Sequence, residues 1–262
     1  MALNEIFSKA LLAILAASCL APENLAQKKT VRIAAAADLQ MAMPEIARAF
    51  QGQTGTIVDV AYGSSGNFYA QIQNGAALDI FFSADNEYPK KLEESGFAES
   101  HSAAIYGVGK IVLWMPANAK CNPERDGWRC LQDPAVKKIA IANPAHAPYG
   151  KAAVAALQKA GIYDAIKAKL VLGENISQAA QFVQSGNAEA GIIAYSLALS
   201  SALQGGKKWV IPAEFYPRIE QTVVVLKSAK SKSAAKEFVR FATHGPGREI
   251  LAKYGFEPPP AQ

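Results

Sequence analysis

The sequence predicts an α/β protein with two lobes, each a sheet flanked by helices. From Thr30 onward, short apolar runs alternate with amphipathic stretches, which is the pattern of strands followed by helices. This alternation stops at a loop that contains two cysteines, Cys121 and Cys130, and then starts again. With 262 residues, of which 50% are hydrophobic, the chain is long enough for two packed cores.

The first 26 residues are typical of a secretory signal rather than of a folded element. Lys9 precedes an apolar run, Ala10–Ala17, which is too short to span a bilayer as an anchor. Ala26 offers a cleavage point, so we expect a soluble periplasmic product. Cys19 leaves a second interpretation open, because the residues before it loosely resemble a lipobox and would make Cys19 a lipidated N-terminus.

The first lobe begins with a buried strand and a helix that has Ile46, Ala47 and Phe50 on one face, the spacing of an amphipathic helix. Glycines and asparagines that follow apolar stretches end the helices. The expected strands are Val31–Ala37, Val58–Tyr62, Asp79–Ser83 and Ile111–Met115, and the expected helices include Asn67–Gln73 and Glu87–Glu94.

The second lobe repeats the same pattern after the loop CNPERDGWRC. Two cysteines this close in an exported protein favour a structural disulfide between Cys121 and Cys130. Alternating strands and helices predict parallel sheets. The expected strands of the second lobe are Lys138–Ala142 and Gly191–Ala194, and its expected helices are Lys151–Ala160 and Ser177–Gln184. The chain then continues with an expected strand, Thr222–Leu226, and two expected helices, Ser233–Thr243 and Arg248–Tyr254. We therefore expect a first lobe of residues 27–112 and 222–262 and a second lobe of residues 113–221.

Four strand-to-helix junctions have the same chemistry. Each is short, rich in small residues and placed at a predicted helix start, where free N–H groups and the helix dipole attract anions. Each could also be an ordinary cap or turn. Two lie in each half of the chain, as a cleft between lobes requires. The junctions are 34–38 (AAAAD), 62–67 (YGSSGN), 143–150 (NPAHAPYG) and 173–177 (GENIS).

Much of the chain resembles the periplasmic molybdate-binding proteins of ABC importers. The resemblance is carried in order by AAAADLQMAMPEIARAF, YGSSGNFYAQIQNGAALDIFFSAD, IAIANPAHAPYGKAAVAAL, ENISQAAQFVQSGNAEAGII and the closing KYGF. It implies a type II periplasmic binding fold that closes over molybdate or tungstate. In that family, serine hydroxyls and main-chain amides from both lobes hold the oxyanion, and a membrane permease receives it.

The resemblance carries over to five positions of this sequence. Ser65 matches a ligand serine, and Tyr149 and Ile176 stand where the family uses main-chain N–H groups. Asp38 stands where the family commonly has a serine ligand. Tyr195 comes one residue after the position of a tyrosine ligand, which is alanine here, and a one-residue offset on a strand turns a side chain to the opposite face.

Asp38 leaves three interpretations open, because a carboxylate repels a dianion in a poorly solvated cleft. It could cap its helix and turn away while its N–H and that of Leu39 face the ligand. It could accept a hydrogen bond from a protonated oxyanion, which would favour phosphate as the ligand. The pocket could also have shifted.

Other classes of function have little support in the residues. The three histidines form no zinc motif, Ser65 lacks the spacing of a nucleophile elbow, and 107–110 (GVGK) is not a phosphate-binding loop. We therefore expect no enzyme activity, no cofactor and no metal-ion ligands. Amino-acid or sugar binding would need an Arg–Asp pair or stacking aromatics at the junctions. The cations are scattered despite a net charge of +5, so we expect no nucleic-acid binding, and a monomer that hinges near Ile111–Pro116 and Pro217–Thr222.

Overall fold

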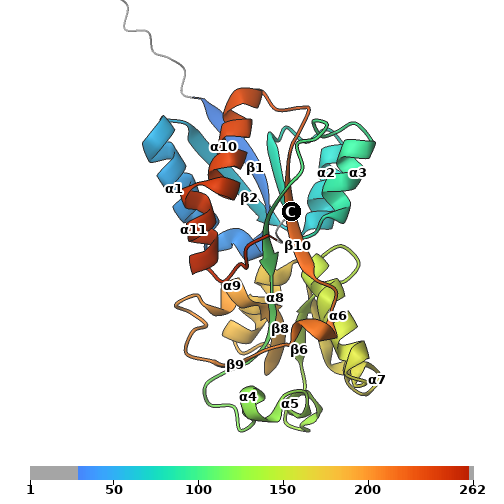
Figure 1. The fold of residues 1–262 in the computed structure, drawn as a ribbon. Helices are drawn as coiled ribbons and strands as arrows, with labels where there is room; N and C mark the ends of the chain where they lie inside the picture. The colour runs from blue at the N-terminus through green and yellow to red at the C-terminus, as the bar shows by residue number, and fades with distance from the viewer. Residues whose placement is uncertain (1–28, 260–262) are drawn as a thin grey trace, which may run out of the picture.

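The computed structural model describes residues 29–259 and has two lobes, each built on a five-stranded sheet (Figure 1). The expected signal segment, including Cys19, lies outside the described residues. No helix within residues 29–259 is long and apolar enough to cross a membrane.

The sheet of the first lobe has the strand order β2-β1-β3-β10-β4. β1 runs parallel to β2 and β3, whereas β10 runs antiparallel to β3 and β4. The strands are β1 (Thr30–Ala36), β2 (Ile57–Gly63), β3 (Ile80–Ser83), β4 (Ala104–Gly109) and β10 (Ile219–Val225).

Helices cover both faces of this sheet, because successive side chains of each strand point to opposite faces. Ile33 packs into the cluster with α1, α10 and α11, whereas its neighbour Ala34 packs into the cluster with α2 and α3. Figure 1 shows these two groups of helices on opposite sides of the sheet. The helices are α1 (Met43–Thr54), α2 (Ser65–Gln73), α3 (Glu87–Glu94), α10 (Lys232–His244) and α11 (Pro246–Lys253).

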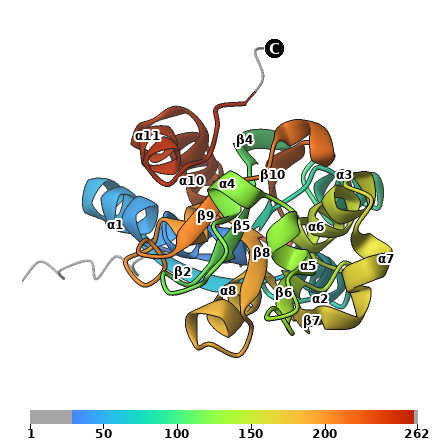
Figure 2. The same cartoon turned by 90° about the horizontal axis from the view of Figure 1, so that it is seen from below.

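The sheet of the second lobe has the strand order β7-β6-β8-β5-β9, in which β5 runs antiparallel to β8 and β9. This lobe is nearest the viewer in Figure 2, with α8 and α6 on different sides of the sheet. Its strands are β5 (Ile111–Met115), β6 (Ile139–Ala142), β7 (Leu170–Gly173), β8 (Ala190–Ala194) and β9 (Lys207–Val210). Its helices are α4 (Pro123–Asp126), α5 (Arg129–Gln132), α6 (Pro148–Lys159), α7 (Tyr163–Ile166), α8 (Ile176–Gln184) and α9 (Tyr195–Ala198), and the 3-10 helices of the chain are η1 (Ala37–Gln40), η2 (Lys167–Lys169) and η3 (Ala213–Phe215).

Two expectations about the strands are wrong. The sheets are mixed rather than parallel, because β5 and β10 enter their sheets from the other lobe and run against their neighbours. The strands β4, β7 and β9, all of which are edge strands, were not expected from the sequence. An edge strand has fewer buried neighbours and needs fewer apolar residues, as the two lysines of β9 illustrate.

The chain crosses between the sheets twice. It first crosses at Lys110, the single residue between β4 and β5, and it returns between Val210 and Ile219. Ile111 and Val112 pair with β8 of the second sheet, whereas Ile219 pairs with Gly109 of the first sheet. The expected hinge at Ile111–Pro116 therefore falls inside strand β5, and the first crossing point precedes it.

A disulfide joins Cys121 to Cys130 with an S–S distance of 2.00 Å, as expected. It ties the start of the segment that forms α4 to helix α5. Both cysteines belong to the second lobe, at the end remote from the first lobe (Figure 1).

Candidate functional site

One small cavity lies where helix starts of the two lobes meet. The starts of η1 and α2 reach it from the first lobe, and those of α6 and α8 reach it from the second lobe. All four predicted junctions therefore contribute to a single site. The residues that line it are Ala36, Ala37, Asp38, Gly63, Ser64, Ser65, Ala84, Ala147, Pro148, Tyr149 and Ile176.

The cavity has almost no free space in this structure. The space open to the centre of a water-sized sphere is about 10 Å³, which is room for about one water molecule. A tetrahedral anion of four oxygens is larger, so the two lobes must separate to admit it.

Neutral donors dominate the lining. The N–H groups of Ser65, Tyr149 and Ile176 belong to the first turns of α2, α6 and α8, where a helix offers no acceptor of its own. No other acceptor in residues 29–259 pairs with them. The cap of α8 leaves its first N–H free, because the Asn175 side chain accepts from the next two N–H groups instead. These N–H groups and the helix dipoles favour an anion in the cavity.

The Ser65 hydroxyl adds a side-chain donor. Its oxygen accepts a hydrogen bond of 2.9 Å from the N–H of Ala84, and the residue is 1% exposed. Because the oxygen is already an acceptor, its own proton is available for a ligand in the cavity.

Asp38 is the one charged residue among the described residues that line the cavity. Its Oδ2 accepts hydrogen bonds from the Tyr149 hydroxyl at 2.9 Å and from Gln221 Nε2 at 2.7 Å. Its Oδ1 is buried without a hydrogen-bond partner in the described chain. Burial raises the pKa of Asp38 to about 6, although the bonds from Gln221 and Tyr149 oppose that rise.

The capping interpretation of Asp38 is wrong. Asp38 is the second residue of η1, and the N-terminus of η1 has no side-chain cap. Its carboxylate instead takes part in a network that links the lobes, because Tyr149 lies on α6 and Gln221 on β10.

The network continues behind Asp38. Gln221 Nε2 also lies 2.8 Å from the Tyr149 hydroxyl oxygen, and Gln221 Oε1 accepts a bond of 2.5 Å from the Tyr106 hydroxyl. Burial, and secondarily the charge of Asp38, holds the pKa of Tyr106 and Tyr149 well above the usual tyrosine range. Both hydroxyls therefore stay protonated and remain donors.

A second set of contacts joins the lobes beside the cavity. The N–H of Gly66 donates to the carbonyl oxygen of His146 at 2.9 Å, and Ser64 Oγ lies 2.9 Å from His146 Nδ1. Asn67 Nδ2 donates to Glu174 Oε1. His146 thus orders the contact between α2 and the loop before α6, and not only its own loop.

Of the five expected site residues, the structure brings four together and leaves Tyr195 aside. Asp38, Ser65, Tyr149 and Ile176 line the cavity, but Tyr195 does not. The ammonium of Lys110 lies 5.7 Å from the centre of the Tyr195 ring. This position agrees with the offset of one residue in the sequence.

Two residues of the site were missed. Ser196 Oγ donates to the carbonyl oxygen of Asp38 at 2.8 Å, and Gln221 bonds to its carboxylate. Gln221 is fully buried in β10 (IEQTVVV), but its neighbours Glu220 and Thr222 are polar as well, so the sequence did not single it out. No feature of the sequence around Ser196 indicates that its hydroxyl faces the first lobe.

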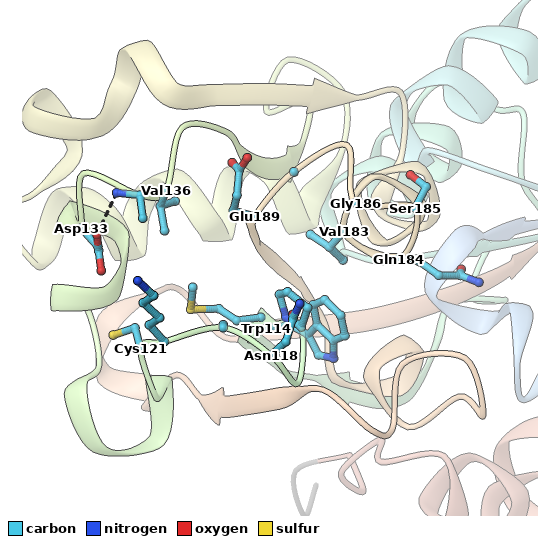
Figure 3. Close-up of a pocket in the computed structure, with 16 residues that line it drawn as sticks. Trp114, Asn118, Cys121, Asp133, Val136, Val183, Gln184, Ser185, Gly186 and Glu189 are labelled. Carbon is cyan, nitrogen blue, oxygen red and sulfur yellow. Dashed lines mark hydrogen bonds between the residues drawn. The ribbon is translucent and has the colours of Figure 1, made fainter.

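A larger pocket of about 580 Å³ lies at the far end of the second lobe (Figure 3). Only residues of that lobe line it, and two of them are carboxylates, Asp133 and Glu189. Glu189 accepts from the N–H groups of Lys137 and Lys138, so it orders the chain there. The pocket lacks the converging helix starts of the interlobe cavity and does not suit an anion as well.

Comparison with known proteins places this fold in a family. The sequence profile of the family described as bacterial extracellular solute-binding protein matches residues 31–257. The chain belongs to this family. The match covers nearly all of the described residues. The relatives of this solute-binding protein are binding proteins rather than enzymes, which confirms the expectation from the sequence that the chain is not an enzyme.

Individual relatives of the solute-binding protein have a more specific function, molybdate binding. It is 41% identical to the molybdate-binding protein ModA of Azotobacter vinelandii, over 88% of this chain and 91% of the relative. It is 40% identical to ModA of Rhodobacter capsulatus, over 85% of this chain and 86% of the relative. These matches confirm the resemblance found in the sequence.

The fold of the solute-binding protein also matches solved structures. The periplasmic molybdate-binding protein of Azotobacter vinelandii superposes with a TM-score of 0.82 at 33% identity, covering 87% of this chain and 99% of the other. The sulfate-binding protein SubI of Mycobacterium tuberculosis superposes with a TM-score of 0.69 at 15% identity, covering 88% and 87%, which shows the fold alone. The expected two-lobed type II fold is confirmed.

Proposed function

We propose that this protein binds molybdate or tungstate between its lobes and delivers it to the membrane permease of an ABC importer. The observation that carries the proposal is that Ser65, Tyr149 and Ile176, whose N–H groups begin helices and have no acceptor in the described chain, line one cavity. Donors from both lobes would complete the shell of the anion only when the lobes close. The similarity to two molybdate-binding proteins supports the same ligand.

The donor set favours an oxyanion over an organic solute. Neutral donors satisfy the oxygens of an anion without burying cations, whose desolvation is costly. No arginine lines the cavity among the residues described, and Tyr149 presents its hydroxyl to Asp38 rather than a ring face for stacking. Phosphate is the alternative that Asp38 raised, and the molybdate-binding relatives do not favour it.

The mechanism follows from the two crossings of the chain. The anion would bind first to the helix starts of one lobe, and the second lobe would then rotate onto it by bending at Lys110 and within 211–218. In the closed form the bond between the Gly66 N–H and His146 would shut the cavity. The closed form would then be recognised by the permease.

Export and assembly complete the proposal. We propose that residues 1–26 direct export to the periplasm, with lipidation of Cys19 as the alternative, and that the mature protein acts as a monomer without a nucleic-acid partner. The expected lobes, residues 27–112 with 222–262 and residues 113–221, would meet at Lys110 and within 211–218 instead, because Ile111 and Val112 pair in the second sheet and Ile219 pairs in the first. Size-exclusion chromatography with light scattering tests whether the mature protein is a monomer.

Calorimetric titration of the mature protein with molybdate, tungstate, sulfate and phosphate tests the proposed ligand. We expect tight binding of molybdate and tungstate only. Ser65→Ala should weaken molybdate binding about tenfold or more, because a hydrogen bond to a charged group contributes about 1.5–3 kcal/mol. Ser185→Ala, on the exposed end of α8, is the matched control and should bind as the wild type does. Failure to bind any of the four anions, or a preference for phosphate, would overturn the proposal.

A further inference from the structure

We infer that Asp38 is a specificity-determining residue that takes up one proton when the anion binds and then donates a hydrogen bond to it through Oδ1. The inference rests on the proposed function, because it concerns the same cavity. Protonation would turn Asp38 from a carboxylate that repels the anion into a neutral hydrogen-bond donor, like the other donors that line the cavity.

The two carboxylate oxygens of Asp38 have different surroundings. Oδ2 is occupied by the donors Tyr149 and Gln221. Oδ1 is fully buried and has no partner within the described chain, although Asp38 itself lines the cavity. A buried polar atom without a partner is costly and calls for an explanation. A proton on Oδ1, shared with an oxygen of the ligand, would satisfy it.

No nearby charge can offset two anions in one closed cavity. Asp38 forms no ion pair in the described part of the chain. The groups that face it are the neutral hydroxyl of Tyr149 from α6, the amide of Gln221 from β10 and the hydroxyl of Ser196 from α9. The repulsion between a carboxylate and a dianion is strong where water is excluded, and a proton from solvent removes it.

The titratable groups nearest to this network do not supply a positive charge that would offset the repulsion between Asp38 and the anion. Tyr106 of β4 stays protonated, and Asp85, which follows β3, is an acid whose pKa burial raises. Asp85 bonds to Ser83 and to the N–H of Tyr88 and does not line the cavity. The pKa of about 6 for Asp38 itself is already close to neutral, so a bound dianion needs to raise it only moderately for the proton to be taken up.

Calorimetry of the wild-type protein with molybdate in two buffers of different ionisation enthalpy counts the protons taken up. We expect close to one proton per anion at about pH 7.5 and much less at about pH 5, where Asp38 is already protonated. Kd should accordingly rise about tenfold per pH unit above about pH 6.5. Molybdate itself stays fully ionised there and does not contribute.

Asp38→Asn separates this mechanism from general effects of pH. Its amide reproduces the neutral donor, so we expect a Kd that does not change with pH and is at least tenfold lower than that of the wild type at about pH 8. Asp85→Asn is the matched control, a buried acid of the same lobe, and should keep the slope of the wild type. If Asp38→Asn does not fold, the number of protons that the wild type takes up still tests whether anion binding is coupled to protonation.

The outcomes distinguish the two proposals. Tight molybdate binding without proton uptake and with a flat pH profile would overturn the role of Asp38 and leave the proposed function standing. No molybdate binding at any pH would overturn the proposed function itself. Proton uptake that persists in Asp38→Asn would assign the proton to another group and would also refute the inference.

Discussion

The hydroxyl of Tyr149 in the second lobe donates to the carboxylate of Asp38 in the first lobe at a distance of 2.9 Å. Both residues are buried, and both line the cavity to which helix starts of the two lobes converge. The main-chain N–H of the same tyrosine lies in the first turn of α6 and has no acceptor within the described chain. Closure of the lobes and the ionisation of Asp38 are therefore linked through one residue.

Tyr149→Phe should weaken molybdate binding because it removes this link but retains the main-chain donor. In the proposed complex Asp38 is protonated, so the lost hydrogen bond joins two neutral groups and costs about 0.5–1.5 kcal/mol, which corresponds to a Kd about 2- to 10-fold higher. The pKa of Asp38 should also rise, since Tyr149 stabilises its charged form. Tyr195→Phe is the control, and an equal loss of affinity in that variant would contradict the placement of Tyr195 outside the cavity.

Gly66→Ala should oppose closure of the lobes. A Cβ atom at Gly66 would lie 2.7 Å from the carbonyl oxygen of His146 in the other lobe, a backbone atom that cannot move aside in the closed form. We expect at least about tenfold weaker binding, while the free energy of unfolding changes by no more than about 1 kcal/mol, since alanine suits a helix better than glycine. Gly52→Ala in α1 meets no atom within 4 Å and serves as the control. Binding unchanged in Gly66→Ala would mean that this contact does not form in the complex.

Asp38 should make the stability of the ligand-free protein depend on pH. Its pKa is about 6 in the folded protein, compared with about 3.9 in an unfolded chain. The folded state thus binds more protons between these values, and stability falls as the pH rises through them. Relative to Asp38→Asn, the wild type should lose up to about 3 kcal/mol between about pH 4 and pH 6.5. Urea unfolding of both proteins across this range measures the difference, and a constant difference would show that the carboxylate is hydrated.

Replacing both Cys121 and Cys130 with serine should lower stability without affecting the site. A disulfide that closes a short loop contributes about 2–4 kcal/mol. Neither cysteine lines the interlobe cavity, so the affinity for molybdate should stay within about twofold of the wild type. Urea unfolding and calorimetry on the same sample test both statements. A large loss of affinity would show that the loop supports the closed form.

Local patterns in the sequence were sufficient to predict the central strands and most of the long helices. Glu87–Glu94 was predicted with its observed bounds, and Ser177–Gln184 begins one residue late. Apolar periodicity and helix-ending glycines report short-range preferences, and those preferences are strong where an element is buried. The edge strand β9 (KKWV) was missed because half of its surroundings are solvent and its lysines conceal the strand pattern.

The sequence by itself determined the two α/β lobes and the four short strand-to-helix junctions, because each depends on a local pattern, and the resemblance to the molybdate-binding family implied that Ser65, Tyr149 and Ile176 belong to one site. Only the tertiary structure decided that Asp38 bonds to Tyr149 and Gln221 rather than capping a helix, and that Tyr195 lies outside the cavity. Asp38 and Gln221 are separated by 183 positions in the chain. Gln221 reaches Asp38 because the second crossing returns the chain to the sheet of the first lobe, where β10 pairs with β3, and no local preference of either residue encodes this contact.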